Sequence, residues 1–203
     1  SQDFREAAFP FGQAVTGTPQ LPSQIKQAYR LANGAFDEVV GIFYGQKYFG
    51  AKAKKDVEDM IQRMLKVYEE RINANKWLSA ETKKKAVIKL KALVLKIGYP
   101  DKIEEIFDLL QVDPKKSLYE NEAAMSTVRT KYMLNKLTKP VDRSVWLMPG
   151  NLNNACYDPQ RNDLTFPAGI LQAPFYDINQ SRGANYGGIG ATIGHEVSHA
   201  FDN

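Results

Sequence analysis

The spacing of apolar residues predicts that most of the first two thirds of the chain is helical. Apolar side chains recur every three or four positions, which is the period of an amphipathic helix. Ser79 is placed as an N-cap, and Gly98 followed by Pro100 ends the helix that it starts. Residues 1–20 contain several Pro and Gly and are predicted to be mixed and rich in turns. The predicted helices span residues 21–48 with a break at 33–34, then 52–73, 79–97 and 118–137.

The pattern changes after Pro140, where short apolar runs alternate with turn residues. We predict a short extended run at Val145–Leu147 and two strands, at Leu152–Tyr157 and Asp163–Phe166, joined by a turn. A glycine-rich run from Gly183 to Gly194 leads into a last helix. Helical glycines are unfavourable, so we expect close packing of this helix on the sheet to compensate. The predicted fold class is mainly α with a small β-sheet (α+β).

The last helix carries the pattern H-E-x-x-H in His195, Glu196 and His199, and these are the only two histidines of the chain. Residues four apart lie about 40° apart around a helix, so the two imidazoles share one face and can bind one zinc ion. Glu196 lies about 100° from His195 and about 60° from His199, still on the metal side. That position suits a general base for zinc-bound water better than a third ligand.

The simpler alternative is a surface helix that carries these residues by chance. A Ser-His or Cys-His nucleophile pair would need another histidine as its base, which favours the metal site. The metzincin pattern needs glycine where Asp202 stands, and a third histidine three residues later. The remaining arrangement takes a glutamate from a later helix as third ligand, and we expect that glutamate to lie beyond residue 203.

Charge and composition argue against a nucleic-acid partner. The net charge is +4, but residues 1–116 hold 20 Lys+Arg against 15 Asp+Glu, and residues 117–203 hold 7 against 8. Solvated helix faces account for the excess better than a phosphate-binding track does. The lysines assigned to such faces are Lys83, Lys84, Lys85, Lys89, Lys91 and Lys96. The single cysteine, Cys156, favours a reducing compartment, and no apolar run is long enough to span a membrane.

Four stretches, taken with the H-E-x-x-H helix, resemble one known family. They are Asn154–Tyr157, Phe166–Gln172, Asn185–Gly190 and Ile97–Asp101, and Trp77-Leu78-Ser79 with Thr82 also fits. Together they resemble the neprilysin and endothelin-converting-enzyme family of zinc metallopeptidases, most closely its bacterial endopeptidase O branch. The resemblance covers nearly the whole chain, although members of this family are several times longer.

The resemblance implies a role for each matching position. His195 and His199 would bind one zinc ion, Glu196 would be the catalytic base, and Asp202 would orient the metal site. Asn154 and Ala155 match the edge strand that holds the substrate backbone, although Asn154 could instead serve a turn. Cys156 stands where relatives often have an aromatic residue, and we expect it to be small and buried.

The resemblance also implies a domain organisation. Residues 1–97 would belong to a helical, chamber-forming domain, residues 98–117 to an inter-domain connection, and residues 118–203 to the N-terminal part of a thermolysin-like catalytic domain ending in the zinc helix. The partners would be oligopeptide substrates and the missing N- and C-terminal segments of the same enzyme, within one polypeptide or as a separate chain. A bacterial cytoplasmic location is favoured, and an extracellular or membrane-anchored one stays open.

Two functions are consistent with these observations. The first is a zinc endopeptidase that cleaves oligopeptides on the N-terminal side of bulky hydrophobic residues, with this chain as an inactive fragment. The second is a non-catalytic helical interaction fragment whose H-E-x-x-H is idle. The zinc content of the purified protein separates the two.

Overall fold

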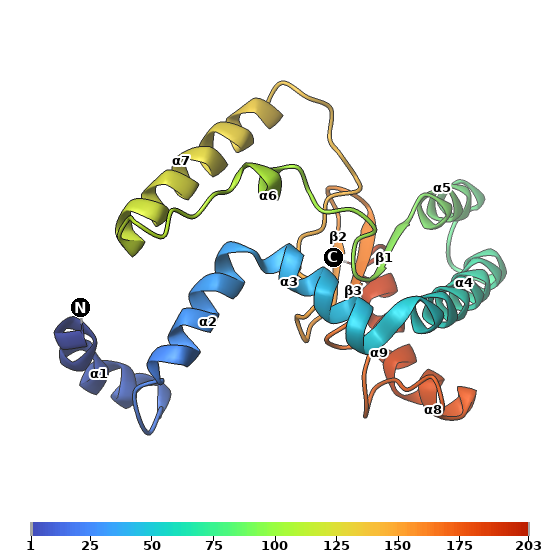
Figure 1. The fold of residues 1–203 in the computed structure, drawn as a ribbon. Helices are drawn as coiled ribbons and strands as arrows, with labels where there is room; N and C mark the ends of the chain where they lie inside the picture. The colour runs from blue at the N-terminus through green and yellow to red at the C-terminus, as the bar shows by residue number, and fades with distance from the viewer. Residues whose placement is uncertain (1, 203) are drawn as a thin grey trace. The chain divides into compact units, whose positions relative to one another are not determined.

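A computed structural model describes residues 2–202 of the chain (Figure 1). The contacts divide it into two compact units, one ending at Asp37 and the other beginning at Glu38. The first unit holds α1 (Gln2–Thr16) and α2 (Gln24–Ala35), and neither helix buries a residue. The Ser23 side chain caps α2 by accepting from the Lys26 backbone N–H. The prediction that residues 1–20 are rich in turns is therefore wrong over α1, which accommodates Pro10 within an exposed helix.

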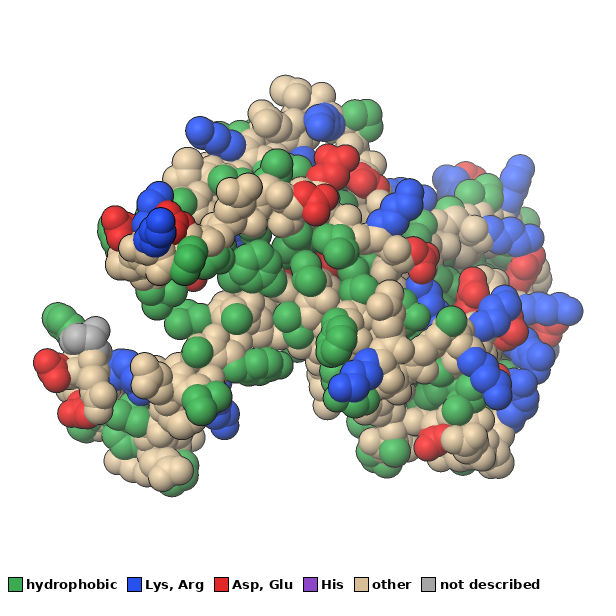
Figure 2. Space-filling view, in the orientation of Figure 1, with side chains coloured by type: hydrophobic (Ala, Val, Ile, Leu, Met, Phe, Trp, Pro, Cys, Tyr) green, Lys and Arg blue, Asp and Glu red, His purple; other side chains and the backbone are tan. Residues whose placement is uncertain are grey.

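The second unit begins with helices. Their order is α3 (Asp37–Tyr44), a π-helical segment (Gly45–Phe49), α4 (Gly50–Ala74) and α5 (Ala80–Lys91), followed later by α6 (Ile106–Leu109) and α7 (Leu118–Lys136). The predicted helices at 52–73 and 118–137 are confirmed to within a few residues. Ser117 and Glu120 form a capping box that fixes the start of α7. Lys and Arg side chains gather over α4 and α5 (Figure 2).

Three strands form one mixed sheet in the order β1-β3-β2. They are β1 (Val94–Gly98), β2 (Cys156–Asp158) and β3 (Asp163–Pro167). β1 runs parallel to β3 with Val94 opposite Asp163, and β2 runs antiparallel to β3 with Cys156 opposite Thr165. The helix predicted over residues 79–97 therefore ends early, and its last part is a strand. The extended run predicted at Val145–Leu147 forms no strand.

The two faces of the sheet differ in character. Ile97, Leu164 and Phe166 point into the apolar core, where α4 and the last helix, α9 (Ile189–Ser198), pack against the strands. The opposite face carries Lys96 and Asp163, which are also buried. The predicted class, mainly α with a small β-sheet, is confirmed. Within residues 2–202, no helix has the length and apolar character needed to cross a membrane.

Candidate metal centre

The helix with the H-E-x-x-H pattern is positioned by its apolar side. α8 (Arg182–Gly187) precedes it, and Gly188 separates the two helices. Ile189, Ile193 and Val197 lie four residues apart on α9 and are fully buried in the core. Burial of this stripe directs residues 195 and 199 toward the opposite, exposed side of the helix.

The structure gives a different reason for the glycines before the H-E-x-x-H pattern from the one predicted. A Cβ on Gly188 would lie 2.4 Å from the carbonyl oxygen of Phe175, so only glycine fits there. A Cβ on Gly194 would meet nothing closer than 3.9 Å, at Met64 and Tyr68 of α4. α9 does pack on the sheet as expected, but the close approach that requires a glycine is to a loop carbonyl before α8.

The two histidines face one another through their Nε2 atoms. These atoms lie 3.0 Å apart, and the rings meet edge to face with centroids 4.5 Å apart. Two imidazoles that bind one zinc ion tetrahedrally place their nitrogens about 3.3 Å apart, because each Zn–N bond is about 2.0–2.1 Å. The observed separation is within a few tenths of an ångström of this value, so His195 and His199 fit a shared zinc ion.

Asp202 lies beside one of the two rings. Its Oδ1 lies 3.1 Å from Nδ1 of His199, and its Oδ2 accepts from the Ser198 hydroxyl at 3.4 Å. When Nδ1–H of a neutral His199 donates to Asp202, Nε2 carries the free lone pair that a metal needs. The structure therefore brings Asp202 beside His199, and its role in orienting the metal site stays a prediction.

Glu196 lies on the other side of the same turn and is only 8% exposed. α9 contacts β2, and the pKa of the Cys156 thiol is raised first by burial and then by the charge of Glu196. The Glu196 carboxylate is therefore near the first residue of β2. Cys156 itself is only half-buried, whereas the sequence analysis expected it to be buried.

Asn154 and Ala155 lie directly before β2, at the edge of the sheet. β2 pairs with β3 on one side, and no other strand among residues 2–202 pairs with its second side. The Asn154 side-chain oxygen accepts from the Ala155 backbone N–H at 2.9 Å, which is a local turn contact. The structure thus places both residues beside an open strand edge near α9, where an extended peptide can pair.

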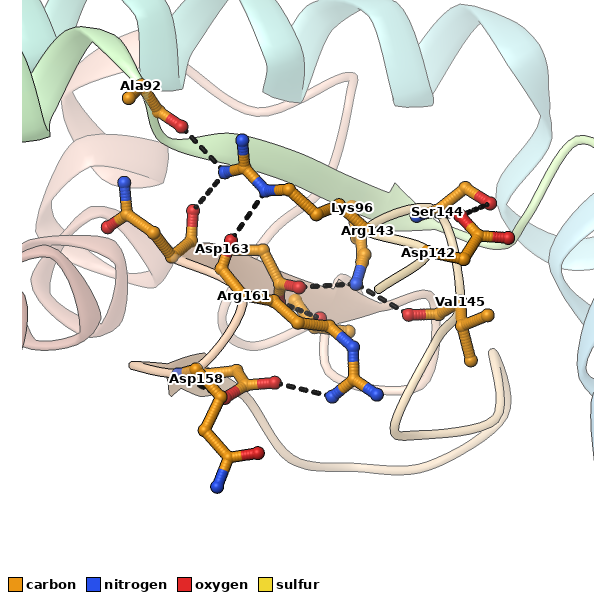
Figure 3. Close-up of polar contacts among 12 residues, drawn as sticks. Ala92, Lys96, Asp142, Arg143, Ser144, Val145, Asp158, Arg161 and Asp163 are labelled. Carbon is orange, nitrogen blue, oxygen red and sulfur yellow. Dashed lines mark hydrogen bonds and ion pairs between the residues drawn. The ribbon is translucent and has the colours of Figure 1, made fainter. Parts of the chain in front are cut away.

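A polar network supports the hairpin from behind (Figure 3). Lys96 Nζ donates to Asp163 Oδ2 at 2.5 Å and to the Val145 carbonyl at 2.6 Å. Arg143 donates to three backbone carbonyls, and Asp158 pairs with Arg161 at 2.7 Å. These bonds attach the segment around residues 142–146 to β1 and to the β2–β3 turn, so the edge strand rests on a fixed support.

Sequence reasoning missed two residues that contact α9. The Tyr68 hydroxyl donates to the Gly194 carbonyl at 2.8 Å, and Lys89 Nζ donates to the Ala200 carbonyl at 2.5 Å. Both come from helices more than one hundred residues earlier, and no local pattern marks them. Among residues 2–202, no group of three or more His, Cys, Asp or Glu side chains is arranged to hold a metal ion.

An H-E-x-x-H helix beside an open strand edge is the arrangement of zinc metallopeptidases. Residues 1–100 and 154–203 match two models that are both described as peptidase family M13. The chain belongs to peptidase family M13, which confirms the resemblance seen in the sequence.

Relatives and solved structures agree with this membership. The chain is 85% identical over 203 residues to the neutral endopeptidase of Lactobacillus helveticus. The alignment covers 100% of this chain and 31% of that protein. The chain is 35% identical to mouse (Mus musculus) neprilysin, covering 28% of it. The crystal structure of PEPO from Lactobacillus rhamnosis HN001 aligns with a TM-score of 0.93 at 45% identity, over 100% of this chain and 32% of that one. The chain therefore spans about a third of the length of these relatives.

Proposed function

We propose that the full-length protein containing this chain is a zinc-dependent endopeptidase that hydrolyses oligopeptides. The observation that carries this proposal is the pair of Nε2 atoms 3.0 Å apart on α9, with buried Glu196 between them in sequence and an open strand edge beside the helix. Relatives named neutral endopeptidase and neprilysin support the same function. Zinc bound here would polarise the scissile carbonyl and lower the pKa of a bound water toward about 7.

The residues of this chain then have separate roles. His195 and His199 would hold one zinc ion through Nε2, and Asp202 would keep His199 in the binding tautomer. Glu196 accepts a proton from the attacking water and delivers it to the leaving amine. A glutamate from another part of the full-length protein would complete the ligand set, since catalytic zinc sites use three protein ligands.

The substrate backbone pairs with the free edge before β2. Ala155 and Asn154 present that edge, and an asparagine amide can both donate and accept hydrogen bonds. The Asn154 oxygen is already used locally, which leaves its NH₂ group to bind a substrate carbonyl. The family resemblance supports cleavage before bulky hydrophobic residues.

The organisation of the full-length protein is part of the proposal. Residues 1–97 would contribute to a chamber-forming helical domain, 98–117 to a connection, and 118–203 to the catalytic domain. In the structure, β1 pairs with β3, so residues 94–98 share a sheet with the proposed catalytic part. A bacterial cytoplasmic location fits the single cysteine.

The test is Glu196→Gln in the full-length protein. We expect peptide hydrolysis to be abolished while the zinc content stays at one ion per molecule, because Gln keeps the shape but cannot accept the proton. The matched control is Glu122→Gln on the exposed surface of α7, which should hydrolyse peptides like the wild type. Near-wild-type hydrolysis by Glu196→Gln would refute the role of Glu196. A zinc-free wild-type protein would support the idle interaction fragment instead.

A further inference from the structure

The backbone carbonyls on both sides of the H-E-x-x-H pattern accept hydrogen bonds from distant side chains. Before the pattern, the Gly194 carbonyl accepts from the Tyr68 hydroxyl of α4 at 2.8 Å. After the pattern, the Ala200 carbonyl accepts from the Lys89 ammonium of α5 at 2.5 Å. Between them, the His195 carbonyl accepts from the Ser198 hydroxyl at 2.7 Å. Three side chains thus bind carbonyls in and just beyond the last turn of α9.

α9 needs such anchors because its own propensity is weak. It is ten residues long and contains Gly190 and Gly194, and helices this short are marginal without tertiary contacts. The N–H of the C-cap residue His199 donates to the His195 and Val197 carbonyls, and later N–H groups donate to the Ser198 carbonyl, so the side-chain bonds add to a backbone cap of the last turn. A cation at this end also complements the helix dipole, which favours Lys89 over a neutral donor.

Lys89 also touches the hairpin that carries the open edge. Its Nζ lies 5.6 Å from the centroid of the Tyr157 ring, in the middle of β2. The Lys89 carbonyl accepts from Asn162 Nδ2 at 3.1 Å, and Asn162 Oδ1 accepts from the Tyr157 hydroxyl at 3.0 Å. Lys89 is therefore bonded both to the end of the motif helix and to the hairpin, within three residues of Asn154.

We propose that Lys89 is a positioning residue for peptide hydrolysis. It sets the distance between the His199 end of α9 and the strand edge that holds the substrate, while Tyr68 fixes the opposite end of the pattern. This inference rests on the proposed endopeptidase function. A misplacement of about 1 Å between reacting groups costs on the order of 100-fold in rate, so a single bridging contact has a measurable effect.

The experiment compares two lysines of α5 in the full-length protein. Lys89→Met keeps the apolar stem and removes the ammonium, and Lys85→Met is the control because Lys85 makes only an exposed ion pair with Glu81 one turn earlier. We expect Lys89→Met to lower kcat/KM by about 10- to 100-fold per zinc-loaded molecule, mainly through kcat. Lys89→Arg should recover part of the loss, and Lys85→Met should match the wild type.

A double-variant cycle tests the bridge itself. Tyr157→Leu removes the ring that Lys89 contacts, so Lys89→Met should have a smaller effect in that background than in the wild type. Equal effects in both backgrounds would overturn the link to β2. Wild-type kinetics in Lys89→Met, or a loss equal to that of Lys85→Met, would overturn the positioning role.

A spectroscopic readout separates this inference from the proposed function. In cobalt-substituted full-length protein, the visible absorption bands report the geometry around the metal. Lys89→Met should shift these bands and Lys85→Met should leave them unchanged. If the wild type hydrolyses no peptide, the proposed function is refuted, and shifted bands in Lys89→Met then still support the part of the inference in which Lys89 positions the His199 end of α9. Unchanged bands together with unchanged kinetics refute the inference alone.

Discussion

At the scale of single residues, the buried ion pair of Lys96 and Asp163 is a costly arrangement in the sheet. The two side chains are 3% and 0% exposed, so both charges have lost most of their hydration. Their hydrogen bond, together with the bond from Lys96 to the Val145 carbonyl, offsets that loss. A buried ion pair adds little stability compared with apolar residues of similar volume in the same place. Removing one member is nevertheless destabilising, because it leaves an uncompensated buried charge.

We expect Lys96→Met to destabilise the sheet by about 3–5 kcal/mol, because it leaves Asp163 buried and unpaired. Replacing both residues, as in Lys96→Met with Asp163→Leu, should recover most of this loss. The measurement is native-state hydrogen exchange of the β1 and β3 amides in the full-length protein. Lys91→Met is the control, because Lys91 is exposed and its ion pair with half-buried Glu69 is worth at most about 1 kcal/mol. Equal effects of Lys91→Met and Lys96→Met would contradict this account.

Residue type alone could not predict the surroundings of these buried or bonded lysines. Lys89 and Lys96 were assigned to solvated helix faces together with their neighbours, yet one binds α9 and the other is buried. Their partners lie 111 and 67 residues away in sequence, and a periodic pattern contains no information about such contacts. The approach of His195 and His199 was predictable because helical geometry relates residues four apart without any distant partner.

At the scale of elements, the turn between β2 and β3 depends on one carboxylate. Burial alone would raise the pKa of Asp158, but hydrogen bonds from the Arg161 side chain and the Gln160 N–H outweigh it and lower the pKa. A carboxylate with a lowered pKa stabilises the fold above its unfolded pKa of about 3.9. That stabilisation is lost as the pH falls through the lower, folded-state pKa.

We therefore expect the wild type to have a higher Tm than Asp158→Asn. This difference in Tm should be constant above about pH 5 and should shrink as the pH falls below about 4. The measurement is the Tm of the full-length protein across this range. Asp108→Asn on α6 provides the matched control, because Asp108 is exposed and should give little gap at any pH. A gap for Asp158→Asn that persists unchanged to pH 2 would rule out this role.

Elements with a strong local pattern were predictable, and those with distant partners were not. α4 buries an apolar stripe, and α7 begins at a Ser-capped turn and ends shortly before Pro140, so their bounds follow from the sequence. β1 was read as the end of a helix because its apolar residues continue the run from α5, and only pairing with β3 makes it a strand. α1 was missed because Pro10 and Gly12 usually mark turns, but its residues are exposed and tolerate them.

At the scale of the whole molecule, the candidate metal centre needs a ligand from outside residues 2–202. Two histidines converge on α9, and the described residues offer no third ligand beside them. The chain also spans only 31% of the neutral endopeptidase that it matches at 85% identity. The activity proposed above accordingly belongs to the full-length protein.

We expect residues 1–203, expressed alone, to bind zinc orders of magnitude more weakly than the full-length protein and to cleave no peptide. The reason is that zinc affinity depends on a full ligand set, and a catalytic site needs three protein ligands. Isothermal titration with zinc and a peptide assay check this expectation, with the full-length protein as the positive control. Chelator-sensitive hydrolysis by material shown to contain this chain only would contradict it.

The strand order β1-β3-β2 has a consequence for biosynthesis. The register places Val94 beside Asp163, so 69 residues separate the parallel partners. At a synthesis rate of about 5–20 residues per second, β1 leaves the ribosome roughly 3–14 s before β3. The β2–β3 hairpin can close locally as soon as it emerges, whereas β1 must wait with Leu95 and Ile97 uncovered. The nascent chain therefore exposes an unpaired apolar strand for seconds, and this interval is when chaperone binding or aggregation at β1 competes with folding.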